Sequence, residues 1–365
     1  MTLILIISPE SWEAHSVSKH HYARELARRG HRVLFFGPPE AGSLRLDLVT
    51  TPGPGRLEVL RGRAVAPALR LMPPVFRRFL EARWLGAVER LAGEMIEVVW
   101  LFENSRFFDM TFAGERLKIY QQVDLDQVFH PLRAAASADI AIALSSPIEN
   151  RIAGSARHLL RLTHGCLPNS AGHSEPPSLD DTFGRYQINA VMTGNLSIEY
   201  LDHELLADLV VAHPDVGFHF VGGYIIGQGL NARVSNAPNA IFWGHHPAGA
   251  LPAFLNRADV LLVAYRAKEH LDQLANPHKM MEYLAAGRCI LASRTLEYEG
   301  RPDLVETALN QTAYKARFAA IVTKPSAFNT PDMVSRRRAF AADNTYPRQL
   351  DRIAEALGSR GPLIS

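Results

Sequence analysis

The chain has 365 residues, of which 47% are hydrophobic, 21% charged and 8% aromatic. This composition is typical of a globular protein long enough for two domains, and it excludes intrinsic disorder and fibrous architecture. Lys and Arg together number 39 against 37 for Asp and Glu, so the formal charge is only +2. There is no global electrostatic case for a nucleic-acid partner, and we expect none.

The two cysteines, Cys166 and Cys289, belong to no CxxC or Cys/His pattern. This excludes a disulfide framework and a structural zinc site, and it favours a reducing compartment. The first apolar run, Leu3 to Ile7, is too short for a signal peptide, and no run of about 18 apolar residues follows. We therefore expect a cytoplasmic protein, which can still bind peripherally at the inner face of a membrane.

In the first half of the chain, short apolar runs alternate with segments of helical periodicity. This pattern is typical of βαβ units, whose helices cover both faces of a parallel sheet. A helix from about Ser16 to Arg29 should end at Gly30, because glycine adopts positive φ there without strain. The strands predicted for this half are 3–7, 32–36, 97–102, 117–121 and 139–144.

The segment 45–90 departs from the average composition, with nine arginines against four acidic residues. Part of it interleaves arginines with Leu, Met, Phe, Val and Trp84, as an interfacial amphipathic helix does. Two interpretations remain open. The helix packs on its own domain and presents a solvated basic face, or it contacts a membrane surface or a lipid substrate.

The second half begins after a stretch rich in Pro, Ser, Gly and Asp, which predicts a linker over 169–188. The strand and helix alternation then starts afresh. We expect an α/β fold with Rossmann-like domains at 1–168 and 189–345, and a final helix in 346–365 that can pack back on the first domain. Ligands should bind where strands end, in a cleft between the domains. The strands predicted here are 189–193, 217–221, 240–243, 259–264 and 288–292, with helices at about 200–212, 248–257 and 277–286.

The stretch NPHKMMEYLAAG is the most informative part of the chain. Asn276 can cap a helix, Pro277 suits its first turn, and Gly287 should end it. Lys279 and Glu282 then share one face near the helix start. A diphosphate could lie against that positive end beside Lys279, while Glu282 accepts hydrogen bonds from a ribose. The alternative is a salt bridge on an exposed helix.

This stretch resembles the P-x-K-x-x-E-Y-L-A-x-G segment of GT-B glycosyltransferases, especially family-4-like enzymes. The resemblance implies two Rossmann-like domains facing an interdomain cleft, a nucleotide sugar bound by the C-terminal domain and an acceptor bound by the N-terminal domain. It extends along most of the chain, through ELARRGHRVLFFG (25–37), LKIYQQVD (117–124), SADIAIALS (137–145), THGCLPN (163–169), AVMTGN (190–195), VGFHFVGG (216–223), AIFWGHHP (240–247) and LNRADVLLVAYR (255–266).

The chain departs from the retaining relatives in two places. Many of those enzymes carry Glu-x7-Glu, but Leu274 lies eight residues before Glu282, and no basic pair follows Asn195. The pattern is closer to bacterial inverting glucuronosyltransferases of exopolysaccharide assembly. In that comparison Lys279 matches the phosphate-binding lysine, and Tyr265 matches a donor-site tyrosine.

The same comparison places Asp124 on the catalytic base of the inverting enzymes. Inversion needs one carboxylate to take the proton of the acceptor hydroxyl, and Asp124 follows a predicted strand. The alternative is an ordinary loop or helix-capping Asp. With Leu125 and Asp126 it also forms D-x-D, the metal site of a different glycosyltransferase fold. Because the surrounding pattern is GT-B, where lysine and helix amides replace the metal, we expect neither metal nor cofactor.

Loops after the other predicted strands complete the candidate site. Tight turns are the alternative for Gly222, Gly223 and His245, and local packing is the alternative for Trp12. The remaining donor-binding candidates are Gly194, Asn195, Gly222, Gly223, His245 and His278, and the acceptor-binding candidates are Glu10, Trp12, His15 and Glu103.

These features predict an inverting transferase that moves a sugar from a nucleoside-diphosphate sugar, of the UDP type, to a glycan or a lipid-linked acceptor. Asp124 would deprotonate the acceptor, and Lys279 would stabilise the leaving diphosphate. One alternative is a retaining family-4 transferase or a GT-B epimerase, and the missing upstream glutamate disfavours the retaining transferase. Another is a non-catalytic two-domain sugar-binding protein, which the lack of an export signal disfavours.

Overall fold

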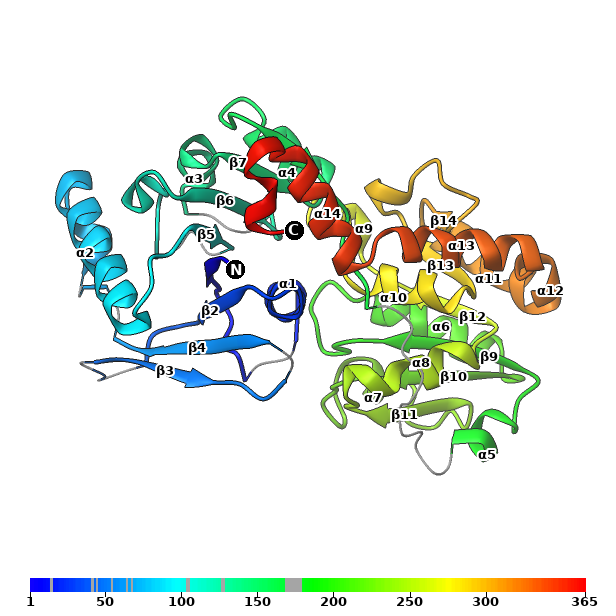
Figure 1. The fold of residues 1–365 in the computed structure, drawn as a ribbon. Helices are drawn as coiled ribbons and strands as arrows, with labels where there is room; N and C mark the ends of the chain where they lie inside the picture. Colours follow the sequence, from blue (N-terminus) through cyan, green and yellow to red (C-terminus); the bar gives the residue numbers. More distant parts are fainter. Residues whose placement is uncertain are drawn as a thin grey trace. The chain divides into compact units, whose positions relative to one another are not determined.

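In the computed structural model, the chain divides into two compact units. Unit 1 comprises Met1–Thr163 and Tyr346–Ser365, and unit 2 comprises His164–Thr345. Each unit is built around its own sheet, flanked by helices (Figure 1), which confirms the predicted α/β class. The structure describes residues 1–13, 16–40, 43, 45–53, 55–63, 65–66, 68–102, 106–125, 129–167 and 179–365.

The sheet of unit 1 has eight strands in the order β3-β4-β2-β1-β5-β6-β7-β8, and only β3 and β4 pair antiparallel. At its centre, Leu5 of β1 lies between Leu34 and Val99 of the neighbouring strands. Such a strand is covered on both faces, which is why it reads as a continuous apolar run. The strands are β1 (Leu3–Ile7), β2 (Arg32–Phe36), β3 (Leu46–Thr50), β4 (Arg56–Gly62), β5 (Val98–Leu101), β6 (Leu117–Gln122), β7 (Ile140–Ala143) and β8 (Leu159–Arg161).

The helices of unit 1 include one from the far end of the sequence. In α14 (Tyr346–Ala356), the Tyr346 ring stacks on His21 of α1 with the centroids 4.7 Å apart, and Leu350 and Ile353 are fully buried. The other helices are α1 (Ser18–Arg28), α2 (Pro74–Ala92), α3 (Pro131–Ser137) and α4 (Ser146–Ile152), with 3₁₀ turns at Leu69–Leu71, Thr111–Ala113 and Gly358–Leu363. No helix among the described residues is both long enough and apolar enough to span a bilayer.

The sheet of unit 2 has six parallel strands in the order β11-β10-β9-β12-β13-β14. The strands are β9 (Ile188–Thr193), β10 (Val216–Val221), β11 (Ala240–Gly244), β12 (Val260–Val263), β13 (Cys289–Ser293) and β14 (Glu306–Ala308). The helices are α5 (Leu179–Phe183), α6 (His203–Ala212), α7 (Gly229–Arg233), α8 (Leu251–Asn256), α9 (Ala267–His270), α10 (Lys279–Ala286), α11 (Gln311–Thr323), α12 (Pro325–Phe328) and α13 (Pro331–Asp343), with 3₁₀ turns at Ala248–Ala250 and Leu296–Tyr298.

The first and last segments of unit 2 run side by side. Cys166 forms a parallel bridge with Thr345, and its N–H donates to the Asn344 carbonyl at 3.1 Å. Of the range predicted as a linker, 169–178 lies outside the described residues. The rest contains α5, whose Leu179 and Phe183 are buried in the core of unit 2.

Candidate functional site

The loops at the carboxyl ends of β9, β10 and β11 are joined by backbone hydrogen bonds. The Gly194 N–H donates to the Val221 carbonyl at 2.9 Å, and the Gly222 N–H donates to the Gly244 carbonyl at 2.8 Å. The three strand ends therefore form one continuous edge of the sheet. Ligands of open α/β sheets bind at such an edge.

Two of the predicted glycines lie in direct backbone contact at this edge. Gly194 has φ of +113° and Gly222 has φ of +152°. A Cβ atom on Gly222 would lie 1.8 Å from the carbonyl oxygen of Gly194, so no other residue fits there. Gly223, in contrast, is exposed and faces open space. The contact brings two loops together while leaving room in front of them.

Lys279, the first residue of α10, reaches this edge. Its ammonium donates a hydrogen bond to the Thr193 carbonyl and lies 5.3 Å from the centre of the Tyr265 ring. The residue is half-buried, and burial lowers the pKa of its ammonium, with Tyr283 and Glu282 opposing the shift. In the described part of the chain, no carboxylate forms an ion pair with Lys279. A partly desolvated cation that forms no ion pair is suited to binding an anion.

Tyr283 fixes the position of α10 against the sheet. Its ring is fully buried, and its hydroxyl accepts the Thr193 N–H at 2.8 Å and donates to the Leu262 carbonyl at 3.4 Å. One helix side chain thus holds the ends of β9 and β12 beside Lys279. Sequence analysis missed this residue. The available signal was a tyrosine among buried apolar residues, because a buried hydroxyl needs partners.

The prediction that Asn276 caps α10 is wrong. The helix begins at Lys279, and the residue before it, His278, has helical dihedral angles and no side-chain cap. The Asn276 carbonyl bonds to His164 Nε2 at 3.0 Å, and the Pro277 carbonyl accepts an amide three residues on at 3.0 Å. Asn276 is therefore held in a turn that precedes the helix.

Glu282 lies one helical turn after Lys279 and is exposed. The predicted alternative, a salt bridge between the two, is not formed. Desolvation by the surrounding protein raises the pKa of the Glu282 carboxyl to about 7, and the Lys279 charge opposes this shift.

Three further donor candidates lie on loops of unit 2. The exposed His278 packs its ring against His164, with the centroids 3.9 Å apart. His245 is exposed directly after β11, and Asn195 accepts the Ser197 N–H at 2.9 Å, which closes a turn after β9. All three are near strand ends or the start of α10. Their contacts with a ligand stay a prediction.

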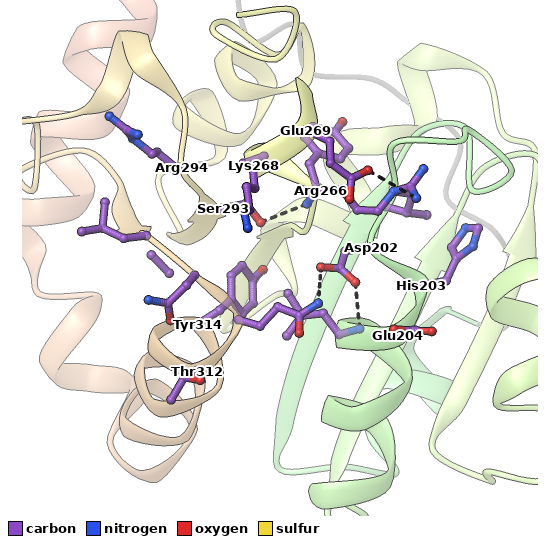
Figure 2. A pocket seen from close by; sticks show the side chains of 18 of the residues that line it. Asp202, His203, Glu204, Arg266, Lys268, Glu269, Ser293, Arg294, Thr312 and Tyr314 are labelled. Carbon is purple, nitrogen blue, oxygen red and sulfur yellow. Dashed lines mark hydrogen bonds and ion pairs between the residues drawn. The ribbon is translucent and has the colours of Figure 1, made fainter. Parts of the chain in front are cut away.

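Tyr265 connects the Lys279 region to a cavity of about 880 Å³. Its ring is nearly buried, and its N–H donates to Ser293 Oγ at 3.0 Å. Figure 2 shows the cavity, whose walls come from the loops after β12, β13 and β14 and from the first turns of α6 and α11. At its centre Asp202 accepts the Leu205 N–H at 3.0 Å and the Gln311 amide at 2.8 Å. Tyr265 is the only predicted donor residue among its lining residues.

The charged groups of this cavity largely neutralise one another. Arg266 pairs with Glu269 at 3.6 Å, and Arg233 pairs with Glu204 at 3.5 Å (Figure 2 draws the former pair). Four of the charged side chains of the cavity are thus paired, whereas the Lys279 ammonium has no carboxylate partner and lies beside Gly194 at the strand ends. We place the candidate donor site at Lys279 for this reason.

In unit 1, Asp124 lies just beyond β6 and is exposed. Its backbone is anchored, because the buried Gln122 side chain donates to the Asp124 carbonyl at 3.0 Å. Arg151 of α4 holds the next carbonyl, that of Leu125, at 2.6 Å. Asp124 is thus exposed to solvent while its backbone is anchored, and its role as a general base stays a prediction.

The loop after β1 carries two acceptor candidates with different surroundings. Glu10 is half-exposed and forms an ion pair at 2.9 Å with Lys19, which is buried. Trp12 packs edge-on against Phe35 with the centroids 5.1 Å apart, and the Arg24 guanidinium lies 4.8 Å from its ring. Trp12 thus makes the local packing contacts of the alternative interpretation.

Two acceptor candidates, His15 and Glu103, lie outside the described residues, as does Asp126. Sequence analysis missed Arg106, whose guanidinium donates to the carbonyls of Ser8 and Gly37 after β1 and β2. No motif marks this residue, because its partners are backbone atoms distant in sequence. Among the described residues, no group of three or more His, Cys, Asp or Glu side chains is arranged to hold a metal ion.

Comparison with known proteins finds similarity in structure alone. No protein-family model matches the sequence, and no curated protein matches it. Solved structures match over nearly the whole chain. Sucrose-phosphate synthase from Thermosynechococcus elongatus has a TM-score of 0.70 and 14% identity, covering 98% of this chain and 99% of that chain.

Two further solved structures give the same result. HepE from Anabaena, in complex with UDP and glucose, has a TM-score of 0.68 and 15% identity, covering 98% of this chain and 99% of that chain. WaaG, a glycosyltransferase involved in lipopolysaccharide biosynthesis, has a TM-score of 0.64 and 12% identity, covering 98% and 100%. The chain therefore has the GT-B fold, as the sequence predicted.

Proposed function

We propose that this protein is a glycosyltransferase that takes a sugar from a nucleoside-diphosphate sugar, of the UDP type, and passes it to a hydroxyl of a glycan or a lipid-linked acceptor. The observation that carries the proposal is the half-buried Lys279 ammonium, which has no carboxylate partner and lies against the loop after β9. The fold shared with HepE, whose structure holds UDP and glucose, supports the choice of donor.

The leaving diphosphate lies against the start of α10 in this proposal. Lys279 and the first amides of the helix stabilise the charge that develops on it, so no metal ion is required. The Glu282 carboxylate accepts hydrogen bonds from the ribose. The Tyr265 ring packs beside the Lys279 ammonium, with its centre 5.3 Å from the nitrogen. The other donor contacts come from Gly194, Asn195, Gly222, Gly223, His245 and His278.

Asp124 serves as the general base on the acceptor hydroxyl, and the sugar is transferred with inversion. Two observations support this assignment. Asp124 presents an exposed carboxylate at the end of β6, and the buried Leu274 occupies the position of the upstream glutamate of retaining relatives. The solved structures share only the fold and do not decide the stereochemistry.

A thermal-shift panel with UDP, GDP, TDP and ADP tests the donor class, because a ligand that binds only the folded state raises the unfolding temperature. We expect UDP to give the largest shift, with and without EDTA, and Lys279→Ala to abolish it. Equal shifts in the wild type and Lys279→Ala would place the site elsewhere and overturn the proposal.

Release of free sugar from UDP-glucose and UDP-glucuronic acid tests the reaction. We expect slow hydrolysis that Lys279→Ala removes and Asp124→Asn strongly reduces, while Asp124→Asn leaves the UDP shift intact. UDP binding without turnover of any donor would favour the non-catalytic alternative. NMR of the glycosidic linkage formed on an acceptor hydroxyl tests the stereochemistry, and a retained anomer would remove the role of Asp124.

A further inference from the structure

Helix α2 has an unusual distribution of side chains. It buries the charged residues Arg77 and Glu81, which are 3% and 0% exposed, and it exposes aromatic and aliphatic ones. Leu71, just before the helix, is 87% exposed, and Val75, Phe76 and Phe79 are 78%, 64% and 57% exposed. Figure 1 shows α2 at the outer edge of unit 1.

The exposed apolar side chains form one face. Phe79 follows Phe76 by three positions and Val75 by four, so its side chain lies beside each of theirs on the helix surface. Leu71 belongs to the 3₁₀ turn that leads into α2. Contiguous exposed apolar groups of this kind mark a surface that contacts another molecule or a membrane.

All exposed charges of this segment are positive. The acidic residues between Leu69 and Ala92 are Glu81 and Glu89, and both are buried. The exposed charged side chains are those of Arg70, Arg78, Arg83 and Arg90. The face therefore combines apolar side chains with arginines alone, which complements an anionic surface bearing an apolar interior.

Buried interactions fix the orientation of this face. The Arg77 guanidinium pairs with Asp109 at 2.9 Å and lies 4.5 Å from the centre of the Phe108 ring, while Trp84 and Leu85 pack in the core of unit 1. Rotating α2 to hide its phenylalanines would expose Trp84 and break the Arg77 pair. The apolar face is therefore held toward solvent.

We propose that α2 docks on a membrane surface that contains anionic phospholipids. Phe76, Phe79, Val75 and Leu71 enter the interface between head groups and acyl chains, and the arginines contact lipid phosphates. Membrane contact is one of the two interpretations that the sequence of 45–90 leaves open. It goes beyond the proposed function, because it requires no sugar transfer and is tested without a donor.

Co-sedimentation of the full chain with vesicles tests this proposal. The vesicles are phosphatidylcholine alone, and phosphatidylcholine mixed with phosphatidylglycerol in a two-to-one ratio. We expect binding to the mixed vesicles only, weakening as salt rises from about 0.1 M to about 0.5 M. Phe76→Ser combined with Phe79→Ser should weaken binding at least about tenfold. Each of Arg78→Gln and Arg83→Gln should weaken it about fivefold.

Val211→Ser is the matched control, because Val211 is 71% exposed on α6 of unit 2. It should bind mixed vesicles like the wild type, and all these variants should keep the wild-type unfolding temperature because the side chains are exposed. Binding that survives the double Phe substitution, or that is equal for both vesicle types, would overturn the proposal. So would a wild type that binds neither vesicle but dimerises through Phe76 and Phe79, since the face would then bind a second copy of the chain.

Discussion

Helices α10 and α2 distribute their charges in opposite ways. In α10 the apolar side chains Met280, Met281 and Leu284 are buried, and Lys279 extends from the first turn to the edge of the sheet without a carboxylate partner. In α2 the buried face includes Arg77, which is paired with Asp109, and the exposed face is apolar and basic. A charge at the surface is available for binding, whereas a paired charge in the core serves the fold.

Residue type alone does not tell these two roles apart. Lys279 and Arg77 are both cations on helices next to a sheet, and both contact an aromatic ring, at 5.3 Å and 4.5 Å. They differ in what neutralises them. The predictions below test whether that difference separates function from stability.

The largest expected effect is on stability. Arg77→Met leaves Asp109 without its partner in a half-buried site, and we expect it to lower the free energy of unfolding by about 3 kcal/mol. Lys279→Met, the matched substitution, removes a partly desolvated charge that has no carboxylate partner, so stability should stay the same or increase. Urea unfolding measures both variants. Similar losses in the two would contradict the distinction between paired and unpaired cations.

The second-largest expected effect is on nucleotide affinity, which should depend on Lys279 and not on an arginine of α2. Lys279→Met should weaken UDP binding about 10- to 100-fold, the range for losing a hydrogen bond to a charged group, and Arg78→Gln on the exposed face of α2 should not change it. Titration calorimetry with UDP measures both. A loss of affinity in Arg78→Gln would show that the α2 face takes part in donor binding.

A smaller effect concerns pH. The pKa of Glu282 is raised to about 7, so the carboxylate that would accept ribose hydroxyls is mostly protonated at pH 6 and mostly ionised at pH 8. We expect the ratio of UDP affinity in the wild type to that in Glu282→Gln to increase severalfold over this interval. The titration of UDP itself affects both proteins equally. A ratio that falls with pH would mean that the Glu282 charge only repels the diphosphate.

The smallest effect concerns the buried carboxyl of α2. Burial raises the pKa of Glu81 to about 8, and Asp109 adds to the shift while Arg77 opposes it. The folded pKa of Glu81 therefore exceeds its unfolded value. The contribution of this carboxyl to stability is fully present below about pH 4.5 and is lost as pH rises through 8. The free energy of unfolding of Glu81→Gln should exceed that of the wild type by at least about 1 kcal/mol more at pH 9 than at pH 5, or by at least about 2–4 °C in unfolding temperature. No pH dependence of this gain would show that Glu81 stays ionised.

Much of the fold could be predicted from the sequence, because strands covered on both faces read as apolar runs. The bounds predicted for β1 and β2, 3–7 and 32–36, are those observed. β3 and β4 were not predicted, because β4 buries Leu57 and Val59 between exposed or half-buried charged residues of the arginine-rich segment. β8 and β14 have three residues each, which is too short for a periodic signal.

The residues of the candidate site could be predicted where they belong to one short segment of the sequence. Lys279 and Glu282 belong to a single short motif, and Gly222 requires a conformation that only glycine adopts easily. The contacts of Tyr283 with Thr193, or of Arg106 with Ser8, join residues far apart in sequence. No spacing encodes such contacts, because the tertiary fold creates them.

Helix α14 has a consequence for the order in which the two units are completed during synthesis. Domains fold as the chain emerges from the ribosome, and the first to emerge usually folds first. Unit 1, however, takes Leu350, Ile353 and Ile364 into its core. All of unit 2 has therefore been translated before the last core residues of unit 1 exist, so the unit encoded first is the last that can mature.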